Sequence, residues 1–237
     1  MKVASMSVEL IDKMGTDLSV VNAARVSFSK VSKFEIEPET NKERLNEKDS
    51  KLIKFLADHN HFTPFCHAFL SFRVKAPIFV ARQLVKHQVG LSWNEVSRRY
   101  VDDEPEFWFP EVWRGRPEGN IKQGSAGVVE SMTEVSPITG ETWTLPLANG
   151  IELHSDQCLR FYQALLSAKV APEQARMVLP LNTMTEWIWS GSLLAFIRVC
   201  KLRCDAHAQE ETREIGNLIR SVLRDTFPWS TAAFLES

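Results

Sequence analysis

A dense run of polar and ionisable side chains at residues 92–100 could bind a phosphate ester. It reads Ser-Trp-Asn-Glu-Val-Ser-Arg-Arg-Tyr, and Gly90 just before it lets the backbone turn sharply. Hydroxyl groups, backbone N–H groups and the forked guanidinium of Arg99 are donors that suit a phosphate. Glu95 can accept hydrogen bonds from a sugar or an amide. From the residues alone, a phosphate site and an ordinary polar surface loop are about equally supported.

A helix expected over residues 77–88 precedes this run and adds further polar groups. Arg82 and Lys86 are four residues apart, as are Gln83 and His87, so the members of each pair share a face of the helix. The remaining positions of the segment are mostly apolar. Polar groups on a buried helix need partners, but the spacing by itself favours a solvated face.

The elements that must position these residues form an α+β pattern. Leu70, Phe72 and Val74 alternate with polar residues, which predicts a half-buried strand. Asp17 and Ser155 are expected as helix N-caps and Pro77 as the first residue of a helix. The expected helices are 17–25, 51–59, 77–88, 155–168, 172–179, 192–203 and 206–227, and the other expected strands are 3–11, 106–109 and 185–189. We predict a core sheet flanked by helices, without a regular alternation of strand and helix.

Length and composition narrow the class of protein. The chain has 237 residues, a formal net charge of −2 and 44% hydrophobic residues, as in an ordinary globular protein. We expect no nucleic-acid or membrane partner, because no overall basic charge is present and the longest uncharged apolar stretch, 187–197, is too short to span a bilayer. The absence of an apolar signal-peptide core and the small number of cysteines predict a cytoplasmic protein.

Two groupings of histidine and cysteine raise the question of a metal site, and we expect none. Cys200, Cys204 and His207 have helical spacing but lack a fourth ligand, so two buried cysteines packing as small apolar groups are the favoured interpretation. The second grouping has no acidic residue in a standard metal pattern, and it consists of His59, His61 and His67.

Three segments together resemble the flavin-dependent thymidylate synthases. They are Ala-Ala-Arg-Val-Ser-Phe at 23–28, the stretch from His-Phe-Thr-Pro-Phe at 61–65 to Arg-Tyr at 99–100, and the stretch from Ala-Arg-Met-Val-Leu-Pro-Leu-Asn at 175–182 to His-Ala-Gln at 207–209. The resemblance implies this family's fold in a single domain, 1–237, with a variable insertion at 115–150 and assembly into a homotetramer. It implies FAD at subunit interfaces, reduction by NADPH, methylenetetrahydrofolate as carbon donor, and conversion of dUMP to dTMP without a cysteine nucleophile. Such an enzyme would suit the cytoplasm of a bacterium or of a phage-infected host.

The resemblance also assigns roles by motif position. The dUMP-binding positions are Gln83, Lys86, Glu95, Ser97, Arg99, Arg176 and Arg203. The FAD-binding positions are Thr63, Lys86, His87, Gln88, Glu95, Ser192 and Arg198. Arg203 and Ser97 are the implied catalytic residues. A guanidinium at Arg203 beside a uracil carbonyl would stabilise negative charge that develops on the ring.

The signature of the family is altered in this chain. The family has Arg-His-Arg followed by seven residues and Ser, whereas this chain has Lys86-His87-Gln88 with one more residue before Ser97. Gln88 lacks the charge, and the extra residue lies within 89–93. Two alternatives therefore stay open: a diverged enzyme that releases a hydroxymethyl product, and a nucleotide- or nucleic-acid-binding relative without catalysis.

Overall fold

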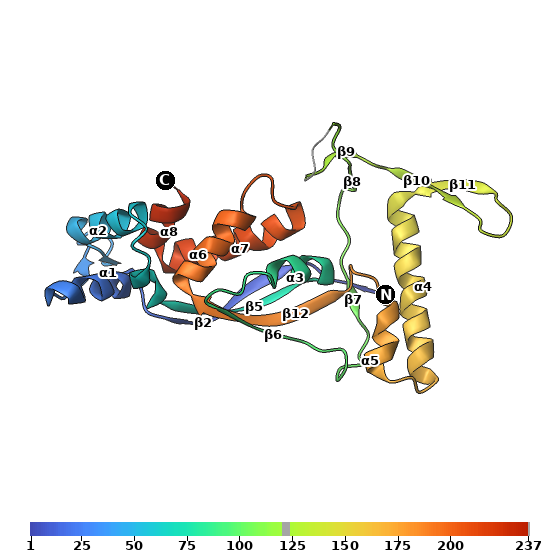
Figure 1. The fold of residues 1–237 in the computed structure, drawn as a ribbon, viewed down its shortest axis with the longest axis horizontal. Helices are drawn as coiled ribbons and strands as arrows, with labels where there is room; N and C mark the ends of the chain where they lie inside the picture. The colour runs from blue at the N-terminus through green and yellow to red at the C-terminus, as the bar shows by residue number, and fades with distance from the viewer. Residues whose placement is uncertain (120–123, 237) are drawn as a thin grey trace. The chain divides into compact units, whose positions relative to one another are not determined.

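The computed structural model describes residues 1–119 and 124–236, and the chain divides into two compact units (Figure 1). Unit 1 consists of Met1–Met6, Lys75–Arg82 and Glu95–Glu186. Unit 2 consists of Ser7–Val74, Gln83–Asn94 and Trp187–Ser237. The fold is a mixed α+β fold, as the sequence predicts.

The main sheet has four strands and belongs largely to unit 2. Its strand order is β2 (Ser7–Met14), β5 (Phe69–Pro77), β12 (Met184–Ser192) and β6 (Leu91–Glu95). Leu70, Phe72 and Val74 on β5 are almost completely buried while their neighbours are not, which confirms the predicted alternation. Phe72 meets Phe196 edge to face with ring centroids 4.8 Å apart, so the aromatic rings anchor a helix on the sheet.

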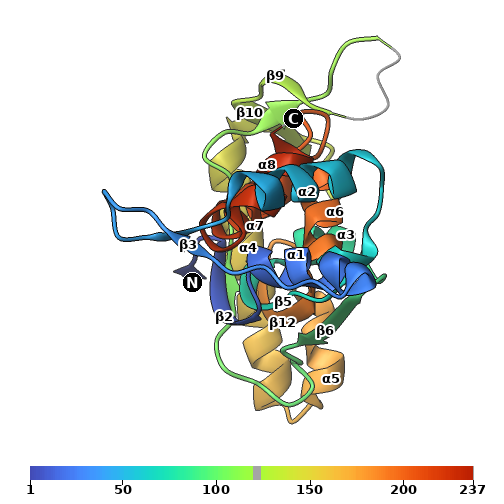
Figure 2. The same cartoon turned by 90° about the vertical axis from the view of Figure 1, so that its left-hand side faces the viewer.

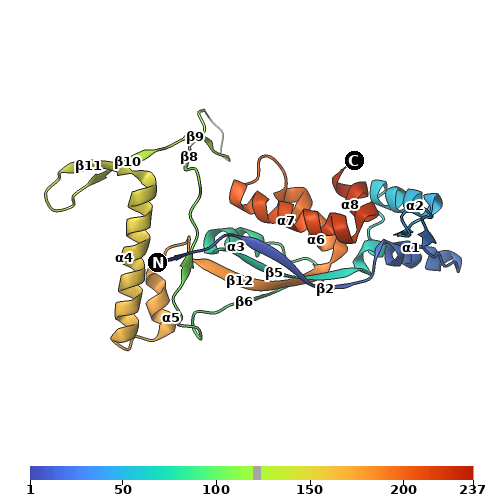
Figure 3. The ribbon, with the colours of Figure 1, turned by 180° about the vertical axis from the view of Figure 1, so that it is seen from behind.

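Helices of unit 2 cover this sheet. Helices α6 (Leu193–Arg203) and α7 (Glu210–Thr226) lie over one of its faces (Figure 3). Helix α2 (Glu47–Asp58) runs beside α8 (Pro228–Leu235), and α1 (Asp17–Arg25) lies near both (Figure 2). The short elements of this unit are η1 (Val26–Phe28), β3 (Glu35–Ile36), β4 (Glu43–Arg44) and η2 (Thr63–Cys66).

Unit 1 is built around one long helix, α4 (Leu147–Ser167), which packs against α5 (Pro172–Ala175) and η3 (Arg176–Val178). A parallel pair joins β1 (Lys2–Val3) to β7 (Glu106–Phe107). Two hairpins precede α4: β8 (Arg114–Gly115) pairs with β9 (Ala126–Val128), and β10 (Ser131–Val135) pairs with β11 (Thr142–Pro146). Helix α3 (Ile78–Leu84) passes along the chain from unit 1 into unit 2.

Three expected helix starts are wrong. Thr16, not Asp17, is the N-cap of α1; Asp17 is buried and accepts hydrogen bonds from Trp229 N (3.1 Å) and Ser230 N (2.9 Å). Ser155 lies buried inside α4, which begins where β11 ends. Pro77 is the last residue of β5, and α3 follows it. Local capping rules missed these positions because tertiary contacts decide them.

Residues 115–150 contain more regular structure than their composition predicts. Their described part forms both hairpins and the first turn of α4, with residues 120–123 outside the described residues. Ile138, near the turn of the second hairpin, is 92% exposed. Whether this stretch is an insertion stays a prediction.

Candidate active site

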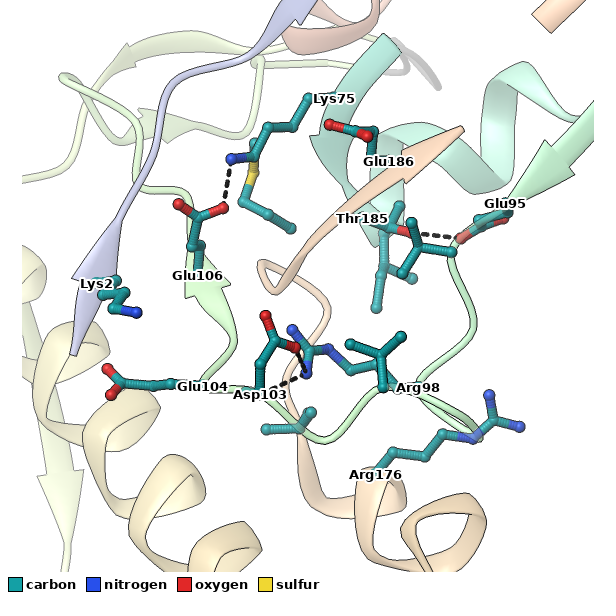
Figure 4. A pocket seen from close by; sticks show the side chains of 15 residues that line it. Lys2, Lys75, Glu95, Arg98, Asp103, Glu104, Glu106, Arg176, Thr185 and Glu186 are labelled. Carbon is teal, nitrogen blue, oxygen red and sulfur yellow. Dashed lines mark hydrogen bonds and ion pairs between the residues drawn. The ribbon is translucent and has the colours of Figure 1, made fainter. Parts of the chain in front are cut away.

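A polar cavity of about 440 Å³ lies within unit 1 (Figure 4). Its volume is in the range of small-molecule sites. Cationic and acidic side chains share its wall with a few apolar ones: Lys2, Lys75, Ile78, Glu95, Val96, Arg98, Val101, Asp103, Glu104, Glu106, Arg176, Leu179, Met184, Thr185 and Glu186. Glu95 and Arg176 are both predicted dUMP-binding residues, and the structure brings them to one cavity although they lie far apart in the sequence.

Glu95 is the last residue of β6 and is oriented by the neighbouring strand. Thr185 Oγ1 on β12 donates a hydrogen bond of 2.7 Å to Glu95 Oε1. The backbone continues the pairing one residue further, because Val96 N donates to Glu186 O at 2.9 Å. A carboxylate held in this way can accept hydrogen bonds from the hydroxyl or N–H groups of a ligand.

The predicted substrate residues Ser97 and Arg99 lie on the turn that follows β6. Tyr100 N and Val101 N both donate to Ser97 O, at 2.9 and 3.2 Å, which closes the turn. Arg99 Nε donates to Ser97 Oγ at 3.2 Å, and the Arg99 guanidinium lies over the ring of Tyr100. Neither Ser97 nor Arg99 lines the cavity, whereas Arg98 between them does.

Arg176 stands at the start of η3, where α5 ends. Its Nε donates to Glu173 O at 3.2 Å, which uses one edge of the guanidinium to fix the side chain. The residue is exposed and lines the cavity. A guanidinium keeps its proton, so Arg176 presents permanent donors suited to a phosphate.

A second cluster of predicted site residues lies within unit 2, at the end of α6. Arg203 Nε donates to His87 Nε2 at 2.9 Å, and Arg203 Nη2 donates to Gln83 O at 3.4 Å. His87 must accept with that nitrogen and is therefore neutral. Burial, and then the positive charge of Arg203, hold the pKa of His87 below its ordinary value. Burial also lowers the pKa of Arg203, which nevertheless stays charged.

The Gln83 amide is oriented by a small network in the same unit. Gln83 Nε2 donates to Gln209 Oε1, and Thr212 Oγ1 donates to Gln83 Oε1 at 3.3 Å. Gln209 Nε2 in turn donates to Glu211 Oε2 at 2.9 Å. Such a chain of hydrogen bonds fixes which end of the amide is donor and which is acceptor.

The predicted flavin residues in unit 2 are of two kinds. Lys86, Gln88 and Thr63 are exposed, and the exposed Arg198 lies with its guanidinium 5.3 Å from the ring centroid of Phe62. Ser192 differs, because it is 6% exposed and its hydroxyl caps α6 by accepting from Ala195 N at 3.2 Å. The contact of each residue with a flavin stays a prediction, and Glu95 belongs to unit 1.

The donor set of unit 2 fits a flavin dinucleotide in its chemistry. A diphosphate is bound by cations, and Lys86 and Arg198 are exposed cations of this unit, whereas a flat ring needs an apolar or aromatic face. Phe62 is 44% exposed and offers such a face beside Arg198. The residues present are therefore suited to hold FAD.

The extra residue of the signature is absorbed in a tight turn. Leu91 N donates to Gln88 O, and Gly90 has a φ of 73°, which favours glycine. Ser192 N donates to Gly90 O at 3.2 Å, so the turn packs against the end of β12. Gly191 is required there, because a Cβ atom on it would lie 2.4 Å from Gly90 O.

Within residues 1–119 and 124–236, no group of three or more His, Cys, Asp or Glu is arranged to hold a metal ion. In the same part of the chain, no helix combines the length and apolar character needed to cross a membrane.

Several residues around the site could not be found from the sequence. Thr185 and Thr212 orient the predicted site residues Glu95 and Gln83, yet each is an ordinary polar residue whose partner becomes adjacent only in the fold. Gln209 belongs to the third matching segment, so the sequence indicates that it lies near the site. Nothing in the sequence indicates its hydrogen bond to Gln83.

Comparisons with known proteins agree with the resemblance. The family model described as thymidylate synthase complementing protein matches residues 9–229. A flavin-dependent thymidylate synthase of Thermosipho africanus is 35% identical over 96% of this chain and 90% of that protein. One of Thermus thermophilus is 38% identical over 97% of this chain and 75% of that protein.

Solved structures share the fold. A UMP/dUMP methylase, PolB from Streptomyces cacaoi bound with 5-Br dUMP, has a TM-score of 0.78 and 24% identity, covering 100% of this chain and 97% of that one. The same protein bound with 5-Br UMP gives a TM-score of 0.78 at 26% identity, covering 99% and 96% of the two chains. Together with the matched family model and the relatives above, these findings confirm the predicted resemblance: the chain belongs to the flavin-dependent thymidylate synthase family.

Proposed function

We propose that this chain converts dUMP to dTMP, with methylenetetrahydrofolate as carbon donor and FAD, reduced by NADPH, as hydride carrier. The observation that carries the proposal is the cavity of unit 1, because it is lined by Glu95 and Arg176, two residues that the motif resemblance predicts to bind dUMP. The similarity in fold to a methylase solved with a brominated dUMP supports a pyrimidine nucleotide as the substrate.

In unit 1, the residues bind the polar ends of the nucleotide. Arg176 holds the phosphate with charge-assisted hydrogen bonds, helped by the Ser97 hydroxyl and Arg99 on the neighbouring turn. Glu95, held by Thr185, accepts hydrogen bonds from the nucleoside. These contacts position the substrate.

Arg203 is the residue that we propose to act on the pyrimidine. The neutral His87 and the Gln83 carbonyl fix its guanidinium, so its positive charge is already oriented when negative charge develops on the uracil ring. A fixed cation at that position stabilises the transition state more than the ground state. Gln83 and Lys86 add donors to the nucleotide, and His87 keeps Arg203 in place.

The exposed cations and aromatic ring of unit 2 hold the flavin. Lys86 and Arg198 would bind the diphosphate, and Thr63, Gln88 and Ser192 would supply neutral hydrogen-bonding groups. Glu95 is a further predicted acceptor for the flavin. When bound, FAD supplies the hydride, a reaction that no protein side chain performs. The protein binds, orients and excludes water.

The proposal extends to organisation and assembly. Residues 1–237 form one domain of the family, which the match of the family model to residues 9–229 supports. The stretch 115–150 is a variable insertion in this domain, as the motif resemblance implies. Four copies assemble into a homotetramer, and light scattering of the FAD-loaded protein should then give four times the mass of the chain.

The experiment that tests the reaction is an anaerobic assay of the purified protein with dUMP, methylenetetrahydrofolate, NADPH and FAD. We expect dTMP by mass analysis, and no product when FAD or dUMP is omitted. A product carrying an additional oxygen would show that the enzyme releases a hydroxymethyl nucleotide instead of dTMP. Binding of dUMP without any product would contradict an enzymatic function.

A further inference from the structure

Arg98 lies between the predicted substrate residues Ser97 and Arg99 but differs from both in its surroundings. Arg98 is flanked by Ser97 and Arg99, which the family motif assigns to dUMP, but only Arg98 points into the cavity wall. Its side chain is 17% exposed, so most of the side chain is removed from water. A charge buried to this extent needs a partner.

Asp103 is that partner, and it closes the loop in which the substrate residues lie. Arg98 Nη1 donates to Asp103 O at 2.9 Å and lies 3.5 Å from Asp103 Oδ1 (Figure 4). The backbone contribution is the stronger one, because the Asp103 side chain is 71% exposed and water competes for its carboxylate. The bridge joins the two ends of the segment 98–103.

The same segment has few other restraints. Its first turn is closed by Tyr100 N and Val101 N donating to Ser97 O, and residues 101–104 belong to no helix or strand. A loop of this kind is restrained mainly by such contacts, since it buries little apolar surface. Removing the bridge would let residues 97–103 sample more conformations, and binding dUMP would then have to order them again.

From this geometry we infer that Arg98 is a positioning residue for nucleotide binding: its bridge to Asp103 holds the loop so that Ser97 and Arg99 are ordered before dUMP arrives. The inference rests on the proposed function for the identity of the ligand. Arg98 itself acts through Asp103 and not as a ligand of the phosphate. Nothing in the family motif marks it, because the position lies between the two residues that the motif specifies.

The test measures the dissociation constant of dUMP by calorimetry for Arg98→Ala, Asp103→Ala and the double variant. We expect about a 10-fold weaker affinity for Arg98→Ala and about 3-fold for Asp103→Ala, since the backbone bond survives the second change. The double variant should stay within about 2-fold of Arg98→Ala, because coupled residues are not additive. Arg98→Lys should recover part of the affinity, because its ammonium can still reach the Asp103 carbonyl.

If Arg98 served only to stabilise the fold, the steady-state kinetics would differ from those expected for a residue that positions the dUMP-binding loop. We expect KM for dUMP to rise while kcat at saturating dUMP changes by less than about 2-fold, because ordering of the loop affects binding only. The control is Arg160→Ala, which breaks the exposed 2.8 Å pair with Asp156 on α4 of the same unit and should leave dUMP affinity unchanged. Equal affinity of Arg98→Ala and the unaltered chain would overturn the inference, as would full additivity, which would make Arg98 a direct ligand.

Hydrogen exchange separates this inference from the proposed function. The Tyr100 and Val101 amides, protected by Ser97 O, should exchange faster in Arg98→Ala than in the unaltered chain without any nucleotide present. Unchanged exchange would refute the positioning role whatever the ligand. If the unaltered chain bound no dUMP but the exchange changed as expected, the loop role would stand and the ligand assignment would fall.

Discussion

Replacing Thr185 by valine should weaken dUMP binding while leaving the fold intact. The hydroxyl donates to Glu95 Oε1 at 2.7 Å, a short hydrogen bond to an ionised acceptor. Valine has nearly the same shape and the same preference for a strand, so β12 should keep its conformation. The change therefore removes one orienting contact of a predicted substrate residue and little else.

The size of the effect follows from the environment of Glu95. A hydrogen bond to a charged group contributes about 1.5–3 kcal/mol, and the exposure of Glu95 lowers this, because water replaces part of the lost contact. About 1 kcal/mol remains, and since about 1.4 kcal/mol is tenfold in affinity, we expect a 5-fold increase, roughly, in the dissociation constant of dUMP.

The assay is a calorimetric titration of the FAD-loaded protein with dUMP, together with thermal unfolding of each variant. Thr185→Ser is the matched control, because it keeps the hydroxyl and should bind dUMP nearly as the unaltered chain does. Equal affinity of the valine variant and the unaltered chain, at equal stability, would refute the role of Thr185 in orienting Glu95. A serine variant as weak as the valine variant would show that the hydroxyl is not the cause.

Four further outcomes follow from the structure. Arg203→Ala should lower kcat/KM about 100-fold, as the loss of a transition-state donor does, while the unfolding free energy changes by less than about 1.5 kcal/mol; steady-state kinetics showing normal activity would contradict the role. The pKa of His87 is lowered by burial and by the neighbouring arginine, so the folded state binds fewer protons than the unfolded chain, and this part of the stability is present above about pH 6.5 and lost below it. Between about pH 8 and pH 5, the unfolding free energy measured with urea should therefore fall less in His87→Gln than in the unaltered chain. Equal falls in the two proteins would contradict this contribution of His87 to stability. Gly191→Ala places a Cβ atom 2.4 Å from a backbone carbonyl and should cost about 1–3 kcal/mol of unfolding free energy, unlike Gly150→Ala, which meets only flexible side-chain ends. Cys66→Ser should keep dTMP formation within about 2-fold, because the reaction uses no cysteine nucleophile, and loss of turnover in a folded variant would overturn that mechanism.

Strong periodic patterns made most of the fold predictable. The strand predicted over 185–189 lies within β12, where the indole rings of Trp187 and Trp189 are almost fully buried. The helix predicted over 192–203 is α6, and the structure shows Ser192 as its N-cap, a role that was not predicted. In both cases the local pattern and the tertiary packing require the same structure.

Predictions failed where distant contacts outweigh local rules. Pro77 fits the first position of a helix, but it ends β5, where Ile78 N donates to Thr183 O at 3.0 Å. Asp17 has the chemistry of an N-cap for its own helix, yet its carboxylate accepts from the first N–H groups of α8, more than two hundred residues away. A single sequence does not reveal such pairings.

The candidate site also contains residues that the sequence identifies and residues that only the fold reveals. Motif positions identified Glu95 and Arg176 before the structure placed both at one cavity. Thr185 was not predicted, because its bond to Glu95 joins residues 90 positions apart and exists only after β6 and β12 align. Motifs name the groups that touch a ligand, whereas the residues that orient those groups emerge from the fold.

The most direct test of the account is a single turnover without NADPH. The protein is loaded with FAD, reduced chemically, freed of reductant under anaerobic conditions and mixed with dUMP and methylenetetrahydrofolate. We expect dTMP in proportion to the bound reduced flavin, with return of the visible absorption of the oxidised form. Formation of dTMP by protein free of flavin, or a bound flavin that stays reduced while no dTMP appears, would contradict it.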